Sequence, residues 1–399
     1  MTAQPLPILP GSWLGLLGGG QLGRMFCQAA HRLGYRVAVL EPDPQSPAGR
    51  IADRHLIAGY DDAEALDDLR RQCAAFTTEF ENVPHGALDT LALHGPVRPG
   101  AKAVAIAQNR ISEKRFLASA GAAIAPHAFI ETPADLPRAQ ALNLYPGILK
   151  SNHSGYDGRG QVRVDGPGDL AAAHARLGCV PCVLEQRIAF ERELSVIVVR
   201  THDGASCVYP VSENIHRDGI LHASIAPARI APAVAAEAQA IAQNIAAALD
   251  YVGVLCVELF LLPGARLAVN EIAPRPHNSG HFTIDVCLTS QFEQQVRSLT
   301  GLPLGDTSLR SAAVMLNLLG DLWEQGEPDW SGLLAQPDVR LHLYGKDQPR
   351  KGRKMGHVTV VGATAGAALA RATSVSALLG AARPRNATIN RSSVTTSSA

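Results

Sequence analysis

The pattern of apolar and polar positions predicts that the chain begins with a Rossmann-like domain. Apolar runs over residues 13–17 and 35–40 flank a glycine-rich turn and an amphipathic helical stretch. Short buried strands that alternate with helices are typical of a βαβ unit in a parallel sheet. A further helix over residues 61–72 and a strand over residues 75–79 extend this unit, and we assign residues 1–107 to it.

The glycine-rich turn contains a phosphate-binding motif of low specificity. Gly18, Gly20 and Gly23 match G-x-G-x-x-G, and Glu41 lies near the spacing expected for an acid that binds a ribose. Taken alone, this motif leaves an NAD(P)-dependent Rossmann oxidoreductase open. Glycines let backbone amides approach any anion at a helix N-terminus, however, so other phosphates fit equally well.

Downstream of residue 107, short apolar runs alternate with helical stretches and predict a mixed α/β region. The expected elements are a helix over 108–120, two short strands between 126 and 145, a strand ending at 150, strands over 183–188 and 194–199, and a helix over 231–249 that follows the segment 208–217. Beyond residue 301, strands over 312–318, 339–343 and 357–361 predict a small third unit. The Ser/Thr-rich tail from residue 382 is expected to be disordered.

Two acids fall opposite each other on a predicted antiparallel hairpin. Apolar runs over residues 254–262 and 266–269 flank a short turn at Gly264. If the turn is centred just after Gly264, Glu258 faces Glu271 with the two Cα atoms roughly 4.5–5.5 Å apart. Carboxylates so placed repel each other unless a cation lies between them, and oxygen ligands on a rigid sheet suit Mg²⁺. The alternative is a solvated hairpin edge with scattered charge.

Basic and polar groups gather at three other places along the chain. The loop at residues 273–281 contains a guanidinium, two imidazoles and an amide, which suit a small anion beside a metal. Lys150 precedes a loop with three glycines in six residues, which predicts a mobile lid over a phosphate or an ordinary flexible hairpin tip. The basic run at residues 344–354 predicts a solvated turn or a surface for a phosphate-bearing substrate.

Composition changes this picture by excluding several classes of protein. The 399 residues suggest about two or three domains, and a formal net charge of zero argues against non-specific binding to nucleic acid or acidic membranes. The seven cysteines favour reduced thiols in a cytoplasmic protein over a redox or zinc role for Cys179 and Cys182. We expect no signal peptide and no membrane-spanning segment.

Seven segments, taken in order, resemble those of one enzyme family. They are GGGQLGRM, GYDGRGQ, LEQRI, RELSVIVVR, VSENIH, VNEIAPRPHNSGH and GRKMGHV. Together they are similar to the 5-(carboxyamino)imidazole ribonucleotide synthases, which are ATP-grasp ligases of purine biosynthesis, over roughly residues 12–365. The resemblance implies an ATP-grasp fold of the α/β and α+β class, with residues 1–107 as the pre-ATP-grasp domain. The ATP-grasp domain would span residues 108–300, with its lid at about 120–190, and a small β-rich domain would span residues 301–381.

The resemblance also implies a role for individual residues. ATP would be bound by Arg110, Lys150, Gly155, Tyr156, Asp157, Gly158, Arg159, Gly160, Gln161, Glu185, Gln186, Arg187, Ile188, Glu193, His216, Asn270 and Glu271. Mg²⁺ would be ligated by Glu258 and Glu271. Catalysis around bicarbonate and its carboxyphosphate would fall to Arg275, His277, Asn278 and Lys150. Aminoimidazole ribonucleotide would be held by Gly20, Gln21, Leu22, Tyr156, Asp157, Arg159, Lys346, Arg353 and Lys354.

The activity implied by the resemblance is N-carboxylation of 5-aminoimidazole ribonucleotide with ATP and bicarbonate, through carboxyphosphate, giving ADP and phosphate. The expected partners are therefore these small molecules and a second copy of the chain in a homodimer, with no nucleic acid and no membrane. An insertion at residues 348–351 leaves open whether Lys346 or the Arg350–Lys351 pair takes the substrate phosphate. Two alternatives remain besides the oxidoreductase: another ATP-grasp carboxylate–amine ligase, and a nucleotide-sensing protein without turnover.

Overall fold

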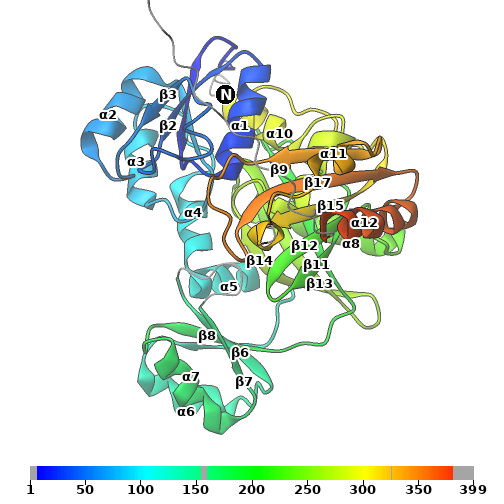
Figure 1. The fold of residues 1–399 in the computed structure, drawn as a ribbon. Coiled ribbons are helices and arrows are strands. Elements are labelled where there is room, and N and C mark those ends of the chain that lie inside the picture. The colour runs from blue at the N-terminus through cyan, green and yellow to red at the C-terminus, as the bar shows by residue number, and fades with distance from the viewer. Residues whose placement is uncertain (1–6, 154–159, 325, 381–399) are drawn as a thin grey trace, which may run out of the picture.

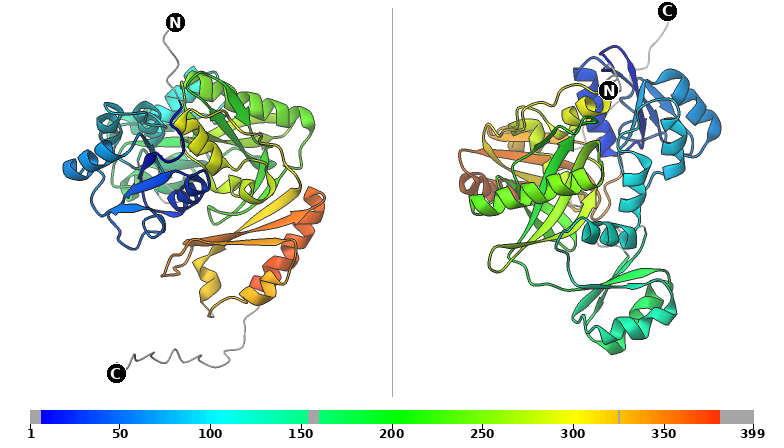
Figure 2. Two further views of the ribbon diagram at one scale, coloured as in Figure 1. Left: turned by 90° about the horizontal axis from the view of Figure 1, so that it is seen from above. Right: turned by 180° about the vertical axis from the view of Figure 1, so that it is seen from behind.

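The computed structural model describes residues 7–153, 160–324 and 326–380, whose strands form three sheets. Figure 1 shows the N-terminal sheet beside a large central sheet, with a small lobe below that Figure 2 shows projecting from the rest of the chain. The predicted disordered tail lies outside the described residues, as does the predicted lid segment at 155–159. Across the described ranges, every helix falls short of the length and apolarity that a bilayer span requires.

The N-terminal sheet is parallel and carries helices on both faces. Its strands are β1 (Trp13–Leu17), β2 (Arg36–Leu40), β3 (Arg54–Leu56) and β4 (Ala75–Thr78), in the order β3-β2-β1-β4. One face packs on α2 (Ala63–Gln72) and α3 (His85–Ala92), and the other on α1 (Gln21–Arg32) and α10 (Gln291–Thr300). Burial on both faces explains the unbroken apolar runs of these strands. The predicted βαβ unit is confirmed, and α10 joins it to the later part of the chain.

The projecting lobe contains a small antiparallel sheet. Its strands are β5 (His127–Ile130), β6 (Gly147–Ser151), β7 (Gln161–Val164) and β8 (Cys182–Gln186), in the order β5-β8-β6-β7. The apolar sides of α6 (Leu136–Ala141) and α7 (Leu170–Arg176), which follow the 3₁₀ turns η1 (Pro133–Asp135) and η2 (Pro167–Asp169), complete its core.

The prediction of two strands between residues 126 and 145 is wrong, because only β5 forms and α6 takes the place of the second. Asp135 accepts hydrogen bonds from the backbone amides of Glu131 at 3.0 Å and Thr132 at 2.9 Å. Together with Pro133 at the first helical position, this cap starts a helical turn. The few apolar residues that follow form too short a run to favour a strand over this helical turn.

The third sheet has nine antiparallel strands. They are β9 (Arg192–Arg200), β10 (Ser206–Val208), β11 (Ser212–Arg217), β12 (Ile220–Ala226), β13 (Gly253–Leu262), β14 (Arg266–Ala273), β15 (Ala312–Leu319), β16 (Val339–Leu343) and β17 (Lys354–Gly362). Their order is β14-β13-β9-β11-β12-β15-β17-β16, with β10 paired to β9. The C-terminal strands therefore continue the central sheet, because β15 pairs with β12. They do not form a sheet of their own.

Helices cover this sheet at both ends of its strand order. α8 (Pro232–Ala248) packs against β9 and β13, and α12 (Ala365–Gly380) packs against β15 and β17. The other helical elements are α4 (Ala101–Gln108), α5 (Arg110–Ser119), α9 (Thr283–Val286), α11 (Trp330–Leu334), η3 (Asn278–Gly280) and η4 (Gly320–Trp323).

The apolar segment over residues 208–212 spans the connection between two strands, because Val208 ends β10 and Ser212 begins β11. Pro210 has no amide hydrogen to donate to a ladder. Tyr209 is fully buried, and its hydroxyl donates to Thr289 O at 2.8 Å. The segment is therefore apolar because it lies in the hydrophobic core. β12 was not predicted, because the residues before the helix at 231–249 were interpreted only as a polar connection to that helix.

The hairpin of β13 and β14 confirms the predicted facing of Glu258 and Glu271, but its turn is centred elsewhere. Leu262 pairs with Arg266, so the turn is centred on Gly264. A bulge at Asn270 then shifts the register by one residue, which brings Glu258 opposite Glu271. The facing of the two acids therefore depends on the bulge rather than on the turn.

Candidate active site

The two hairpin carboxylates each contact a cationic side chain. Glu258 Oε1 lies 2.9 Å from His277 Nε2, and Glu271 Oε2 lies 3.4 Å from Arg110 Nη1. The mutual repulsion of the facing acids is thus offset by an imidazole and a guanidinium. Two carboxylates on neighbouring strands of a rigid sheet are also a donor set that fits a hard divalent cation such as Mg²⁺.

Glu258 and His277 hold each other in the charged state. Burial alone would raise the pKa of Glu258, but His277, and after it His216 and Arg275, lower that pKa. Burial would lower the pKa of His277, but the neighbouring Cys256 and Glu258 raise it. At neutral pH the pair is therefore an imidazolium and a carboxylate.

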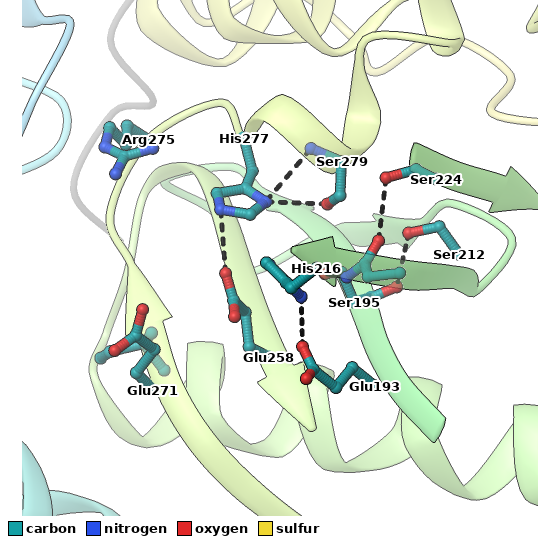
Figure 3. A network of polar contacts seen from close by, with 12 residues as sticks. Glu193, Ser195, Ser212, His216, Ser224, Glu258, Glu271, Arg275, His277 and Ser279 are labelled. Carbon is teal, nitrogen blue, oxygen red and sulfur yellow. Dashed lines mark hydrogen bonds and ion pairs between the residues drawn. The ribbon is translucent and has the colours of Figure 1, made fainter. Parts of the chain in front are cut away.

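The loop after β14 is held in place by Gln291 and leaves one amide unpaired. The His277 amide donates to Gln291 Oε1 at 2.9 Å, and Gln291 Nε2 donates back to His277 O at 2.8 Å. Figure 3 shows the His277 ring between Glu258 and Ser279. Asn278 is buried, yet neither polar atom of its side chain has a hydrogen-bond partner among the described residues. Buried amides are normally paired, so this one is free to bind a ligand.

Arg275 reaches from the same loop to the N-terminal sheet. Its guanidinium forms an ion pair with both carboxylate oxygens of Glu81, which follows β4 at the carboxyl end of the sheet. Burial alone would raise the pKa of Glu81, but Arg275 lowers it. A cleft lies between these parts of the chain, and its lining includes Glu81, Asn82, Arg110, Asn152, Glu271 and Arg275.

Two lysines converge on one carboxylate at the base of the projecting lobe. Lys150 Nζ on β6 lies 3.0 Å from Glu185 Oε2 on β8, and Lys114 Nζ on α5 lies 3.4 Å from the same oxygen. Burial alone would raise the pKa of Glu185, but Lys150 and Lys114 lower it to about 2. Lys114 also donates to Asn270 O, the bulge residue of β14, at 2.8 Å. The lobe and the hairpin are thereby tied together at the cleft.

A second pair of polar side chains lies beside the hairpin acids on the same sheet. His216 on β11 contacts Glu193 on β9, the strand that separates β11 from β13 (Figure 3). Burial would lower the pKa of His216, but Glu193 raises it. Asn214 on β11 bonds Ser195 on β9 and Ser224 on β12, which fixes the register of these three strands.

The rest of the predicted ATP site lies at the lobe and its connector. Gly160 O accepts from Ser151 N at 2.9 Å, and Gln161 pairs with Lys150 across β6 and β7. Gln186 ends β8, and Arg187 and Ile188 begin the connector after it. The amides of Gln186 and Arg187 donate to Pro126 O and Pro146 O. Five predicted residues lie outside the described ranges: Gly155, Tyr156, Asp157, Gly158 and Arg159.

The basic run of residues 344–354 docks on the N-terminal domain. Lys346 Nζ donates to Gln21 Oε1 at the start of α1 and to Lys354 O at 2.8 Å. Arg50 donates to Gly345 O at 2.7 Å and pairs with Asp347. In contrast, Arg353 bonds Gln348 O within its own loop. Among the predicted substrate residues, Lys346 and Gln21 are therefore together, and Leu22 packs in the apolar cluster beneath them.

The glycine-rich turn binds two of the protein's own carboxylates. The amides of Gly20 and Gly23 donate to the two oxygens of Glu79 at 2.5 and 2.7 Å, and the Gly19 amide donates to Glu41 at 2.8 Å. Glu41 also accepts from Tyr60. These amides are not available to a pyrophosphate, which argues against the dinucleotide interpretation of G-x-G-x-x-G.

Comparison with known proteins covers nearly the whole chain. Three family models match in order: a ribonucleotide synthetase pre-ATP-grasp domain at residues 12–108, an ATP-grasp domain at 115–292, and a phosphoribosylaminoimidazole carboxylase C-terminal domain at 313–371. The N5-carboxyaminoimidazole ribonucleotide synthase of Bacillus subtilis is 44% identical over 353 residues, covering 88% of this chain and 92% of that protein. Its counterpart in Brucella melitensis is 45% identical over 352 residues, with 88% and 96% covered. This chain belongs to the N5-carboxyaminoimidazole ribonucleotide synthase family.

Solved structures agree with this assignment. An ADP complex of an N5-carboxyaminoimidazole ribonucleotide synthetase is 41% identical, with a TM-score of 0.88 and coverage of 93% of this chain and 97% of that one. The Aspergillus clavatus enzyme in complex with ADP and 5-aminoimidazole ribonucleotide is 35% identical, with a TM-score of 0.84 and coverage of 92% and 98%. The family and the ATP-grasp fold predicted from GYDGRGQ and NEIAPRPHNSGH are confirmed.

Some residues of this synthase-family cleft were not assigned a role from the sequence. Glu81 was not predicted as the partner of Arg275, and Lys114 was not predicted to join the lobe to the hairpin. The buried Glu113, which accepts from the Ile272 amide at 2.7 Å, was missed. The only sequence signal for Glu81 was its place after a buried strand, where open α/β sheets bind ligands. Lys114 and Glu113 carry no such signal.

Proposed function

We propose that this chain carboxylates 5-aminoimidazole ribonucleotide through carboxyphosphate, which it makes from bicarbonate and Mg²⁺-bound ATP. Membership of the family makes it an ADP-forming ligase that carboxylates aminoimidazole ribonucleotide at the expense of ATP in purine biosynthesis. The observation that supports carboxyphosphate as the intermediate is a pair of facing carboxylates, of which Glu271 lines the cleft together with Arg275 and His277. The unpaired amide of Asn278 belongs to the same loop. Two carboxylates that can hold a metal ion, beside an unpaired side-chain amide and a guanidinium, suit the transfer of a phosphoryl group to a small anion.

ATP would lie between the projecting lobe and the central sheet. Lys150 and Arg110 would neutralise its phosphates, since both are cations in contact with carboxylates at the edge of the cleft. Glu193, with His216 beside it, would accept the ribose hydroxyls, and the 185–188 connector would contact the base. Glu258 and Glu271, with Asn270, would hold Mg²⁺, which when bound supplies positive charge against the β- and γ-phosphates.

The Arg275–Asn278 loop would hold the bicarbonate. Its oxygen attacks the γ-phosphorus and ADP leaves, which gives carboxyphosphate. Arg275 would offset the negative charge of carboxyphosphate. The side-chain amide of Asn278, which has no hydrogen-bond partner among the described residues, would donate to its carboxyl group. Carboxyphosphate then releases CO₂ and phosphate, and the exocyclic amine of the imidazole takes the CO₂ and loses a proton.

The ribonucleotide would bind between the glycine turn and the basic run. Lys346 is favoured over Arg350 and Lys351 for its phosphate, because Lys346 contacts Gln21 at the domain boundary while Arg350 is exposed and bonds Gln348. Lys354, Arg353, Gly20 and Leu22 complete the proposed site, together with Tyr156, Asp157 and Arg159 from outside the described residues.

Three broader assignments are part of the same proposal. The domains would be residues 1–107, 108–300 with the lid at about 120–190, and 301–381. The chain would act as a homodimer and would work in the cytoplasm. All seven cysteines lack a disulfide partner, which supports a reducing compartment.

The test is ADP release with ATP, Mg²⁺ and bicarbonate, measured with and without 5-aminoimidazole ribonucleotide. We expect strong stimulation by the ribonucleotide and one carboxylated product for each ADP. ADP release without stimulation would point to another acceptor amine, and hence to another ATP-grasp ligase. No ADP release in any mixture would contradict the proposed activity.

A further inference from the structure

A cluster of imidazoles lies behind the loop that carries His277. His342 on β16 and His357 on β17 are register partners on neighbouring antiparallel strands. Their rings stack with centroids 4.4 Å apart and an angle of 12° between the planes. Asp285, on α9, lies against this pair, with its Oδ2 atom 3.0 Å from His342 Nε2. Three elements thus bring two nitrogen ligands and one oxygen ligand to one place.

A fourth side chain extends the cluster. His281 precedes Asp285 by four residues, so the two lie about one helical turn apart. The His281 ring centroid is 4.8 Å from that of His357. Both side chains are fully buried, and the Nε2 atom of each has no hydrogen-bond partner in the described parts of the chain. Unpaired buried nitrogens are uncommon, and the Nε2 atom of His357 in this cluster indicates a missing ligand.

The other nitrogen of each buried ring is bonded, which fixes the orientation of the ring. His357 Nδ1 lies 2.9 Å from the Tyr344 hydroxyl, and His281 Nδ1 lies 3.3 Å from Gln291 Nε2. For His357, whose Nδ1–H can donate to the Tyr344 hydroxyl oxygen, this leaves Nε2 as the nitrogen that can bind a metal. His281 Nδ1 instead accepts from the Gln291 amide, which leaves the proton of the neutral ring on Nε2. Burial, the largest cause, lowers the pKa of both His281 and His357.

We propose that Asp285, His342 and His357 bind a transition-metal ion of the zinc class, with His281 packed beside them. One ligand atom from each of the three lies within 4.8 Å of the others. Zinc bonds of about 2.0–2.1 Å require ligand atoms roughly 3.3 Å apart, so the ligand atoms approach one another by up to about 1.5 Å and the rings rotate out of the stack. His342 keeps 27% of its side chain exposed, which gives the ion a path from solvent.

The chemistry of this cluster differs from that of the hairpin acids. Imidazole with one carboxylate selects zinc, cobalt, nickel or iron, whereas the two carboxylates Glu258 and Glu271 suit Mg²⁺. The proposed ion would join α9, which follows the Arg275–Asn278 loop, to the strands that flank the basic run. Its expected role is to hold these two sides of the cleft together. The inference does not depend on the proposed function.

The test is a Co²⁺ titration of the full chain, without a histidine tag and after dialysis against a chelator, followed by visible absorption. We expect one equivalent to bind with the spectrum of a nitrogen-ligated site, and Zn²⁺ to displace it. The double variant Asp285→Asn/His342→Asn should lose this binding, and His342→Asn alone should weaken it at least tenfold. Zn²⁺ should raise the thermal midpoint of the native chain but not that of the double variant.

Two controls locate the ion. His94→Asn alters an exposed histidine elsewhere, and Glu258→Gln/Glu271→Gln alters the hairpin acids, so both variants should retain the binding. Failure of the native chain to bind one equivalent would overturn the proposal, whatever the variants do. Binding that survives in Asp285→Asn/His342→Asn but is lost in the hairpin variant would also overturn it, because the ion would then occupy the active site.

Discussion

At the scale of single residues, Arg275 and Glu81 connect two parts of the molecule through one ion pair. Arg275 follows β14 and Glu81 follows β4, and their side chains are 19% and 24% exposed. Removing one partner would leave the other charge largely buried and unpaired, at a cost of about 3 kcal/mol. The pair therefore positions the Arg275–Asn278 loop against the N-terminal domain as well as placing positive charge in the cleft.

Glu271→Gln is expected to lower turnover by roughly 10²-fold or more, which corresponds to about 3 kcal/mol of transition-state stabilisation. The glutamine amide removes one negative charge from the two proposed metal ligands. The measurement is kcat for ADP release at saturating Mg²⁺. Glu64→Gln, which changes an exposed acid on α2, is the matched control and should have no effect. A Glu271→Gln enzyme with near-native kcat would rule out Glu271 as a ligand.

Asn278→Ala is expected to lower kcat by about 10²-fold, on the scale of losing one donor to a developing anion. The buried amide has no partner among the described residues, so its removal leaves no other polar group unpaired. The dissociation constant for ADP, measured by calorimetry, should stay unchanged. An altered ADP affinity together with a normal kcat would place Asn278 in the nucleotide site instead.

At the scale of elements, two local features of the β13–β14 hairpin bring the proposed metal ligands Glu258 and Glu271 opposite each other. Its turn is centred on Gly264, where Gly264 and Ala265 both have positive φ angles of 77° and 60°. The bulge at Asn270 then restores the facing of Glu258 and Glu271. An alanine with positive φ is strained, because its Cβ approaches the following carbonyl oxygen.

Ala265→Gly is expected to raise the free energy of unfolding by about 0.5–1 kcal/mol. Relief of the backbone strain outweighs the greater freedom of glycine in the unfolded chain. Urea denaturation would measure the change. Ala240→Gly, at an exposed position in the middle of α8, is the matched control and should lower the free energy of unfolding by about 1 kcal/mol. A loss of stability at both positions would contradict the assigned turn.

At the scale of the whole molecule, contacts between distant segments build the cleft. α10 packs on the N-terminal sheet, Lys346 contacts Gln21, and Lys114 joins the projecting lobe to the hairpin. Charged pairs also join strands away from the cleft, where Glu213 on β11 bonds Arg192 and Arg229. Burial alone would raise the pKa of Glu213, but Arg229 and then Arg192 lower it.

Glu213→Gln is expected to reduce the fall in the free energy of unfolding as the pH decreases. Because the folded pKa of Glu213 lies below its usual value of 4.5, the unfolded state binds more protons as the pH falls, and stability decreases. The carboxylate contributes fully above pH 4.5 and loses its contribution as the pH drops through the folded pKa. Urea midpoints at several pH values would show a native-minus-variant gap that narrows in acid, and a gap independent of pH would contradict the assignment.

Elements with a strong local signal were predicted correctly. The βαβ unit follows from unbroken apolar runs on both sides of a glycine turn, and α8 from a long run of helix formers. Where the signal was short, prediction failed: α6 was taken for a strand, because a short apolar run looks alike in a strand and in a helix. The facing of Glu258 and Glu271 was predicted, but for a turn centre that the bulge at Asn270 replaces.

The sequence by itself determined the types of most elements, the family, and the identity of the acids and of the loop after them. These depend on periodicity and on short motifs, which are local properties of the chain. Only the tertiary structure decided that Glu79 fills the glycine turn, that Arg275 pairs with Glu81, and that His281 and Asp285 lie over His342 and His357. Each of these contacts joins side chains from separate elements, so its formation depends on how whole elements pack, which no local pattern encodes.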